Sequence, residues 1–397
     1  MIKYFISIFA LVLSFSSIAA DPKLKAGPWR FEMKATFAVI PFVIDFKYVG
    51  KNLTGTLRNG KENIPLNNIE VKRNFITIPV QHYESELQLE LLTKDILRGK
   101  FVRLNKNPLV EVPVEGKSGS KERFPGRYEK PTAHFNGTWS VTLKEDDGKE
   151  AKGIVILEQK KNKLNGTIMS PTGDYRYFEG YVNGEFFEAA SFDGVYNYIF
   201  KGRIKKNKME ATILGSWKTE IVGFKDDNAA LADPYKQTQL DKLSFTFPDI
   251  NGKEVSLSDF QGKPVIVSFF GSWCPNCVDE MNYLVPWFKQ NKKRGIELVA
   301  LSFERSLSQK DARMQLTKAV KKLDMDFPVL LAGSTSEDRP MEKILGLKNF
   351  ISFPTTIYLN RKHEVVKIHA GFTGPSTGKF YEAWKEEFNH DVNELLK

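Results

Sequence analysis

Short runs of alternating apolar and polar residues fill the first half of the chain, which is the pattern of half-buried β-strands. The clearest run is 87–91, where Leu, Gln, Leu, Glu and Leu follow one another. The dipeptides Asn59-Gly60 and Asn183-Gly184 are strong signals for two-residue hairpin turns. The pattern therefore predicts antiparallel β-structure across this half of the chain.

The β pattern occurs twice. Residues 137–139 (Gly-Thr-Trp) echo residues 27–29 (Gly-Pro-Trp), and residues 164–167 (Leu-Asn-Gly-Thr) echo residues 53–56 (Leu-Thr-Gly-Thr). We expect two homologous units whose strand number and length suit small up-and-down barrels. The opening Gly-x-Trp and the Gly-Thr hairpin resemble calycin or lipocalin-like domains. The aromatic residues of these units are expected in the barrel cores, although they could instead line a ligand cavity.

The periodicity changes in the last two-fifths of the chain. Strand-like and helix-like segments alternate there, which is typical of βα units. Residues 265–270 are a continuous apolar run, as expected of a strand buried on both faces, and 296–303 are a second such run. Apolar residues between 277 and 288 fall at helical spacing. This part of the chain is expected to form an α/β domain.

The N-terminus has the features of a signal peptide. Lys3 precedes an apolar run at 4–15, and small residues follow it up to Asp21. The run is too short for a comfortable transmembrane helix, so we expect a soluble mature protein in an exported compartment, most simply a periplasm. The predicted organisation is a signal peptide at 1–20, β repeat 1 at 21–115, a linker at 116–132, β repeat 2 at 133–225, a linker at 226–239 and the α/β domain at 240–397.

Composition adds limits on partners. Of the 397 residues, 41% are hydrophobic and 27% are charged, which is ordinary for a globular protein. The formal net charge of +10 suits an anionic membrane surface or an acidic partner, so peripheral membrane association is one expectation. The lysine clusters at 160–163 and 205–208 contain asparagine and are expected at hairpin tips. No basic stripe interleaved with aromatic residues is present, so nucleic acid is not an expected partner.

The two cysteines, Cys274 and Cys277, are the candidate chemistry. Exported proteins usually use cysteine for long-range disulfides, but a bridge across so short a loop hardly constrains the unfolded chain. A zinc site needs four ligands, and the sequence has no second cysteine pair and no histidines at ligand spacing. The pair is therefore predicted to be a redox-active disulfide, with no metal and no other cofactor.

The position of the pair explains its expected reactivity. Cys274 follows a buried strand and begins a helix, where free N–H groups and the helix dipole stabilise an anion. Such positions lower a thiol pKa from ~8.5 to about 3.5–7.5. Cys274 would attack a partner disulfide and Cys277 would resolve the mixed disulfide. Pro275 suits the first helical turn because it needs no N–H partner.

These motifs carry a family resemblance. The segment from 245 to 397 resembles the thioredoxin superfamily, and it is most similar to the exported TlpA/ResA-like branch. The resemblance rests on the sequence 249–260, on Gly-Lys-Pro at 262–264, on Gly-Ser-Trp-Cys at 271–274 and on Glu280. It implies that this segment is an α/β thioredoxin-like domain. Together with the repeated strand pattern, the predicted fold is two antiparallel β-barrel-like (calycin-like) repeats followed by this domain.

The resemblance also implies further site residues. Pro354 would be a cis-proline facing the cysteines, and Glu280 would exchange a proton with Cys277. Asn276 stands where many relatives have a second proline, which leaves the direction of electron flow open. The residues expected to contact a partner chain are Trp273, Pro275, Asn276, Phe353 and Thr355.

Three functions are compatible with these features. The first is an exported disulfide reductase that acts on protein disulfides, such as those of apocytochrome c, and is re-reduced by a membrane or periplasmic electron donor. The second is a thiol peroxidase, although the Pro/Thr motif that precedes a peroxidatic cysteine is absent. The third is a non-enzymatic protein whose β units capture a ligand. The first is the prediction.

Overall fold

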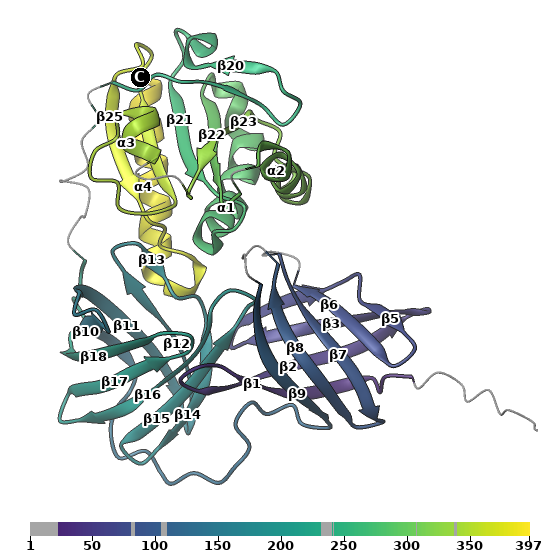
Figure 1. Ribbon diagram of the computed structural model, residues 1–397. Helices are drawn as coiled ribbons and strands as arrows, with labels where there is room; N and C mark the ends of the chain where they lie inside the picture. The colour runs from purple at the N-terminus through teal and green to yellow at the C-terminus, as the bar shows by residue number, and fades with distance from the viewer. Residues whose placement is uncertain are drawn as a thin grey trace, which may run out of the picture.

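The structure is a computed structural model that describes residues 23–80, 84–104, 109–231, 240, 242–306, 308–336 and 340–397. The predicted signal peptide at 1–20 and residues 232–239 of the predicted linker lie outside the described residues. Figure 1 shows the α/β domain standing on two β units that lie side by side. Within the described ranges, no helix has both the length and the apolar character needed to cross a bilayer.

The first β unit is an open, curved sheet. Within the described residues it has nine antiparallel strands in the order β4-β3-β2-β1-β9-β8-β7-β6-β5, so β4 and β5 are its edges. Because the sheet does not close on itself, the predicted barrel is here a half-barrel. Its strands are β1 (Gly27–Lys34), β2 (Val39–Val49), β3 (Asn52–Asn59), β4 (Glu62–Leu66), β5 (Glu70–Lys72), β6 (Phe75–Val80), β7 (Ser85–Thr93), β8 (Ile96–Arg103) and β9 (Val110–Ser118).

The second β unit is a closed barrel. Its described strands follow the order β11-β10-β18-β17-β16-β15-β14-β12-β13, and an additional pairing between β11 and β12 closes the barrel. The two lysine clusters lie at hairpin tips, between β11 and β12 and between β16 and β17, as predicted. Its strands are β10 (Gly137–Glu145), β11 (Glu150–Lys160), β12 (Lys163–Ser170), β13 (Gly173–Asp174), β14 (Phe178–Asn183), β15 (Phe186–Phe192), β16 (Asn197–Lys205), β17 (Lys208–Leu214) and β18 (Lys218–Lys225).

The repeat seen in the sequence is present in the structure. Trp29 and Trp139 are both fully buried at the start of their units. Each indole N–H donates to the carbonyl oxygen four residues earlier, Lys25 at 2.9 Å and Phe135 at 3.2 Å. A buried indole needs such a partner, so the Gly-x-Trp signature fixes the same local geometry twice.

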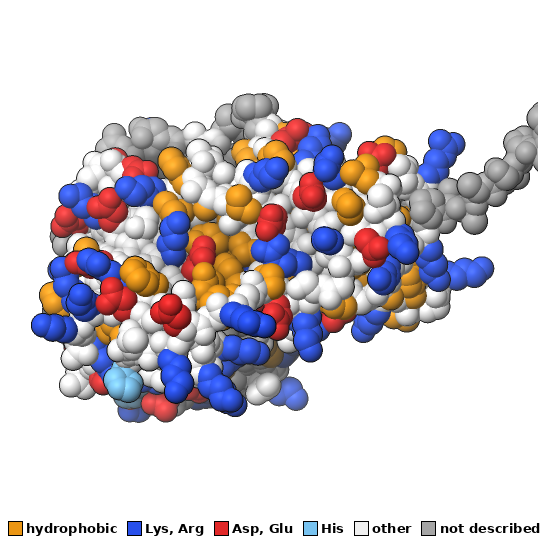
Figure 2. Space-filling model, turned by 90° about the horizontal axis from the view of Figure 1, so that it is seen from below, with side chains coloured by type: hydrophobic (Ala, Val, Ile, Leu, Met, Phe, Trp, Pro, Cys, Tyr) orange, Lys and Arg blue, Asp and Glu red, His pale blue; other side chains and the backbone are white. Residues whose placement is uncertain are grey.

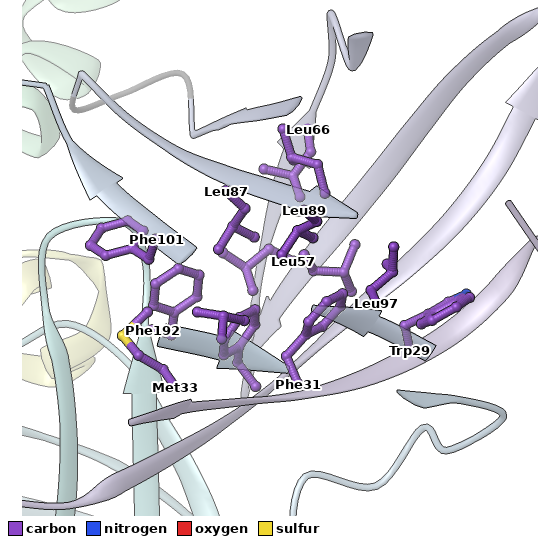
Figure 3. Close-up of a cluster of buried hydrophobic side chains, with 14 of the residues drawn as sticks. Trp29, Phe31, Met33, Leu57, Leu66, Leu87, Leu89, Leu97, Phe101 and Phe192 are labelled. Carbon is purple, nitrogen blue, oxygen red and sulfur yellow. The ribbon is translucent and has the colours of Figure 1, made fainter. Parts of the chain in front are cut away.

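The second unit completes the core of the first. Phe192, from β15, lies among the aromatic and aliphatic side chains of the half-barrel (Figure 3), with ring centroids 4.1 Å from Phe42 and 5.4 Å from Phe101. The side chain of Asn59 binds the backbone of Phe192, donating to its carbonyl oxygen at 2.7 Å and accepting from its N–H at 3.2 Å. The open side of the first sheet is thus filled by a neighbouring domain.

The α/β domain has a five-stranded sheet in the order β23-β22-β21-β24-β25 within the described residues. β21 to β23 are parallel, and β24 and β25 run antiparallel to their neighbours. All six residues of β21 are buried, as the apolar run predicted. The elements are β19 (Thr246–Pro248), β20 (Glu254–Ser256), η2 (Leu257–Phe260), β21 (Val265–Phe270), α1 (Pro275–Asn291), η3 (Lys292–Arg294), β22 (Glu297–Glu304), α2 (Gln309–Leu323), β23 (Val329–Ser334), α3 (Pro340–Leu345), β24 (Thr355–Leu359), β25 (Val365–Ala370), η4 (Pro375–Thr377) and α4 (Lys379–Leu396).

Arg176 joins the three units. Its guanidinium pairs with Asp279 of α1, with Glu62 of β4 and, at 3.0 Å, with Asp193 of the second unit. Asp174 adds a second link, because its carboxylate accepts from the N–H of Gly374 at 2.7 Å. The helix that begins with the cysteines is therefore tied directly to the second β unit, and through Arg176 to the first.

The face of the β units that points away from the α/β domain is mainly polar. Figure 2 shows this face from below, with many Lys, Arg, Asp and Glu side chains around a patch of hydrophobic ones near its middle. The cysteine helix α1 lies in the part of the α/β domain that faces the β units (Figure 1), and its Asp279 pairs with Arg176 of the second unit. The candidate site is therefore close to the second β unit.

Candidate redox site

Cys274 and Cys277 form a disulfide at the N-terminus of α1. Cys274 is the N-cap, and its Sγ accepts a hydrogen bond from the N–H of Cys277 at 3.2 Å. Pro275 occupies the first helical position, as the spacing predicted. Cys274 is 4% exposed and Cys277 is fully buried. After reduction, the same N–H and the helix dipole would stabilise a thiolate on Cys274.

The loop before β24 brings a backbone edge to the disulfide. The peptide bond between Phe353 and Pro354 is cis, the geometry that the resemblance implied. The carbonyl oxygen of Phe353 lies 3.7 Å from Sγ of Cys274. The side chain of Thr355 points inward, is buried, and donates to the carbonyl oxygen of Ser352 at 2.7 Å. Phe353 is therefore beside the sulfur, whereas Thr355 belongs to the sheet.

Glu280 lies one turn along α1 from Cys277, on the same face of the helix. It is 1% exposed, and its carboxylate accepts from the hydroxyls of Ser268 at 2.7 Å and Thr356 at 2.8 Å. Burial raises the pKa of the Glu280 carboxyl from 4.5 to about 7, and the two hydroxyls offset part of that rise. The group can therefore hold or release a proton near neutral pH.

Sequence reasoning missed both hydroxyl partners. Ser268 is the single polar residue in the apolar run 265–270, and Thr356 lies two residues after Pro354. A polar side chain inside a strand buried on both faces needs a hydrogen-bond partner, which was the available signal for Ser268.

Trp273, directly before Cys274, packs against the cluster of buried residues that contains both cysteines. Its indole N–H donates to the carbonyl oxygen of Phe303 at 2.9 Å, and its ring meets that of Phe353 edge to face at 5.5 Å. The guanidinium of Arg305 lies 4.4 Å from the indole ring. These contacts fix the position of the Trp273 ring against Phe353, whose carbonyl oxygen lies beside Cys274.

A buried glutamate that sequence reasoning also missed supports the segment before Trp273. Glu304, at the end of β22, accepts from the N–H of Ser272 at 3.1 Å, from its hydroxyl at 2.6 Å and from the hydroxyl of Ser302 at 2.7 Å. Burial raises the pKa of this carboxyl above its usual value. An acidic residue directly after the apolar run 296–303 was the available signal in the sequence.

Asn276 contacts the second β unit. A side chain at Gly173 would overlap the amide of Asn276, and Gly173 has a φ of +135°, which favours glycine. Nearby, Gly371 packs against the backbone of Pro171 and Thr172. The segment 171–176, which contains β13, thus lies along the edge of the redox site. No sequence pattern predicted this contact.

Comparison with known proteins agrees with this geometry. The Redoxin family model matches residues 240–383. The thiol-disulfide oxidoreductase ResA of Bacillus subtilis (strain 168) is 31% identical over 157 residues, which cover 40% of this chain and 74% of that protein. The chain belongs to the TlpA/ResA-like branch of the thioredoxin superfamily. As a member of this branch, it is a thiol-disulfide oxidoreductase.

Other TlpA/ResA-like and thioredoxin-family proteins are also similar. A ResA protein of Bacillus cereus is 29% identical over 147 residues, covering 37% of this chain and 78% of that protein. A thiol:disulfide interchange protein of the thioredoxin family from Chlorobium tepidum TLS aligns in structure with a TM-score of 0.31 and 23% identity, covering 40% of this chain and 97% of that chain. The Redoxin match lies within the α/β domain, so the β units fall outside it.

Proposed function

We propose that this oxidoreductase is an exported disulfide reductase that transfers two electrons from Cys274 and Cys277 to a disulfide in another protein. One observation carries the proposal: Sγ of Cys274 is the N-cap of α1, accepts the N–H of Cys277 and lies 3.7 Å from the carbonyl oxygen of Phe353. This arrangement puts a stabilised sulfur next to a backbone edge with which an incoming chain can pair.

The proposed reaction has two exchange steps. In the first, the thiolate of Cys274 attacks one sulfur of the partner disulfide, a mixed disulfide forms, and the other partner sulfur leaves as a thiolate that takes up a proton. In the second, the thiolate of Cys277 attacks Sγ of Cys274, and the partner leaves as a dithiol. The structure holds the pair in the disulfide state that follows the second step.

Glu280 would assist the second step. Cys277 is buried, so its thiol needs a nearby base before it can attack. An ionised Glu280 on the same face of α1 can take that proton, and a carboxyl with a pKa of about 7 can then release it near neutral pH. We assign Glu280 this proton exchange and assign Trp273 the shielding of the sulfur from water.

Four residues complete the proposal, and the buried Thr355 is not among them. Phe353 and Pro354 would offer backbone to the partner chain, and Pro275 and Asn276 would form the opposite edge of its path. A membrane-bound or periplasmic dithiol donor would re-reduce the disulfide. Export rests on the pattern of residues 1–20, and the mature protein is expected to begin at Asp21.

Insulin reduction tests the activity. The wild-type protein, supplied with dithiothreitol, is expected to accelerate cleavage of the insulin disulfides, and Cys274→Ser is expected to abolish this acceleration. Cys277→Ser should accumulate a covalent adduct with the substrate that excess dithiothreitol releases. An unchanged rate in Cys274→Ser would contradict the proposal. Faster turnover of hydrogen peroxide than of insulin would favour the thiol peroxidase instead.

A further inference from the structure

A cleft of about 480 Å³ lies between the second β unit and the redox motif. The turn between β10 and β11, the β13 segment and the start of β18 line it, and Asn276 forms its wall on the side of the α/β domain. Asn276 stands between the two cysteines in the chain, so a ligand in this cleft would contact the loop that carries the disulfide.

The cleft has an aromatic wall. Tyr175 and Tyr196 are stacked with ring centroids 6.0 Å apart, and Trp217 lies 6.4 Å from the ring of the buried Tyr198. Tyr175, Tyr196 and Trp217 are each partly exposed. Partly exposed Tyr and Trp rings offer apolar contact area and attract cations to their faces.

The rim of the cleft is acidic. Glu145, Asp146 and Asp147 are exposed in the β10–β11 turn. Asp147 pairs with Lys149, whereas within the described residues Glu145 and Asp146 form no ion pair. Lys218 is the basic residue of the lining and pairs with Glu220. This negative rim contrasts with the net charge of +10 of the whole chain, so the cleft favours a positively charged ligand.

A buried polar atom points to the same cleft independently of its charge. Asn276 is 6% exposed, and its Oδ1 has no hydrogen-bond partner among the described residues. A buried acceptor without a partner is costly, so an N–H donor that reaches this oxygen would relieve that cost. Peptide N–H groups and the side chains of Lys and Arg supply such donors.

We propose that this cleft binds a Lys- or Arg-bearing segment that flanks the disulfide of the partner protein. The inference rests on the proposed reductase function and adds the substrate class. The acidic rim attracts the basic side chain, the aromatic wall packs along its aliphatic part, and Oδ1 of Asn276 accepts a hydrogen bond from the segment. The β unit thereby selects substrates for the neighbouring dithiol.

Two disulfide peptides that differ in their flanking residues test the proposal. One peptide carries Lys on both sides of its disulfide and the other carries Glu. The full-length protein is expected to show a kcat/KM about two- to fivefold higher for the Lys peptide, in line with the modest strength of exposed charge pairs. The preference should shrink as ionic strength rises, because salt screens such charges.

A pair of variants with the same change in net charge locates the preference. The double variant Glu145→Gln, Asp146→Asn is expected to lose most of the preference for the Lys peptide, through a higher KM for that peptide. The matched control Glu111→Gln, Glu115→Gln neutralises two exposed carboxylates on β9 and should keep it. Equal kcat/KM for both peptides, or equal loss in both double variants, would overturn the inference.

The small substrate hydroxyethyl disulfide separates this inference from the proposed function. If the wild-type protein reduces it but treats the two peptides alike, the cleft is not a basic subsite and the reductase proposal stands. If the wild-type protein reduces neither hydroxyethyl disulfide nor the peptides, the reductase proposal fails, and the inference is overturned with it.

Discussion

Replacing Glu280 with glutamine removes a buried carboxyl and keeps its shape. Glutamine can still accept a hydrogen bond from the hydroxyls of Ser268 or Thr356, so the packing beneath the disulfide is retained. The variant lacks the group that titrates. The difference in stability between the wild-type protein and Glu280→Gln therefore reports the cost of ionising this carboxyl inside the domain.

The size of this cost follows from the pKa. Burial raises the pKa of Glu280 from 4.5 to about 7. At about 1.4 kcal/mol for each pKa unit, the ionised carboxyl destabilises the folded state by about 3 kcal/mol relative to the protonated one. The folded chain holds this proton up to a higher pH than the unfolded chain. Stability is therefore lost as pH rises from 4.5 to about 7 and stays low above that.

Urea unfolding of both oxidised proteins across the range from about pH 4 to about pH 8 measures this effect. Near pH 4 the two free energies of unfolding should agree, and near pH 8 Glu280→Gln should be more stable by about 3 kcal/mol. Glu386→Gln, at an exposed position on α4, is the matched control and should show no such growing gain. Parallel pH curves for the wild-type protein and Glu280→Gln would mean that burial does not raise the pKa of Glu280.

Two further predictions concern the contacts between the units. Phe192→Ala should lower the free energy of unfolding by about 3–5 kcal/mol in urea titrations, because it leaves a cavity between Phe42 and Phe101. A loss below about 1 kcal/mol would mean that the half-barrel does not depend on its neighbour. Arg176→Met leaves buried carboxylates without their cation and should cost about 3–5 kcal/mol. Limited proteolysis should cleave the Arg176→Met variant faster than the wild-type protein between the units. Cleavage at the wild-type rate would argue against the role of Arg176 in joining the units.

Local patterns predicted much of the fold. The alternation of the N-terminal half, the duplicated Gly-x-Trp and the apolar run 265–270 correspond to the two β units and to the central strand β21. They succeeded because each reflects a short-range rule, namely side-chain period, turn geometry or continuous burial. The position of Cys274 at a helix start belongs to the same class.

Contacts between distant segments could not be predicted from local sequence patterns. The first sheet stays open because Phe192, more than a hundred residues after Asn59, fills its core. Arg176 meets partners from three units, and Gly173 meets Asn276, without any periodicity that links them. Such pairings depend on how whole domains pack, and each side taken alone looks like an ordinary turn or strand residue.

The reactivity of Cys274 shows whether the start of α1 activates this sulfur. In the reduced Cys277→Ser variant, Cys274 is the remaining thiol, and its rate of alkylation by iodoacetamide can be followed against pH. The account predicts a midpoint below about 7.5 in the folded protein and near ~8.5 in urea. A midpoint near ~8.5 in the folded protein as well would contradict the claim that the start of α1 activates this sulfur.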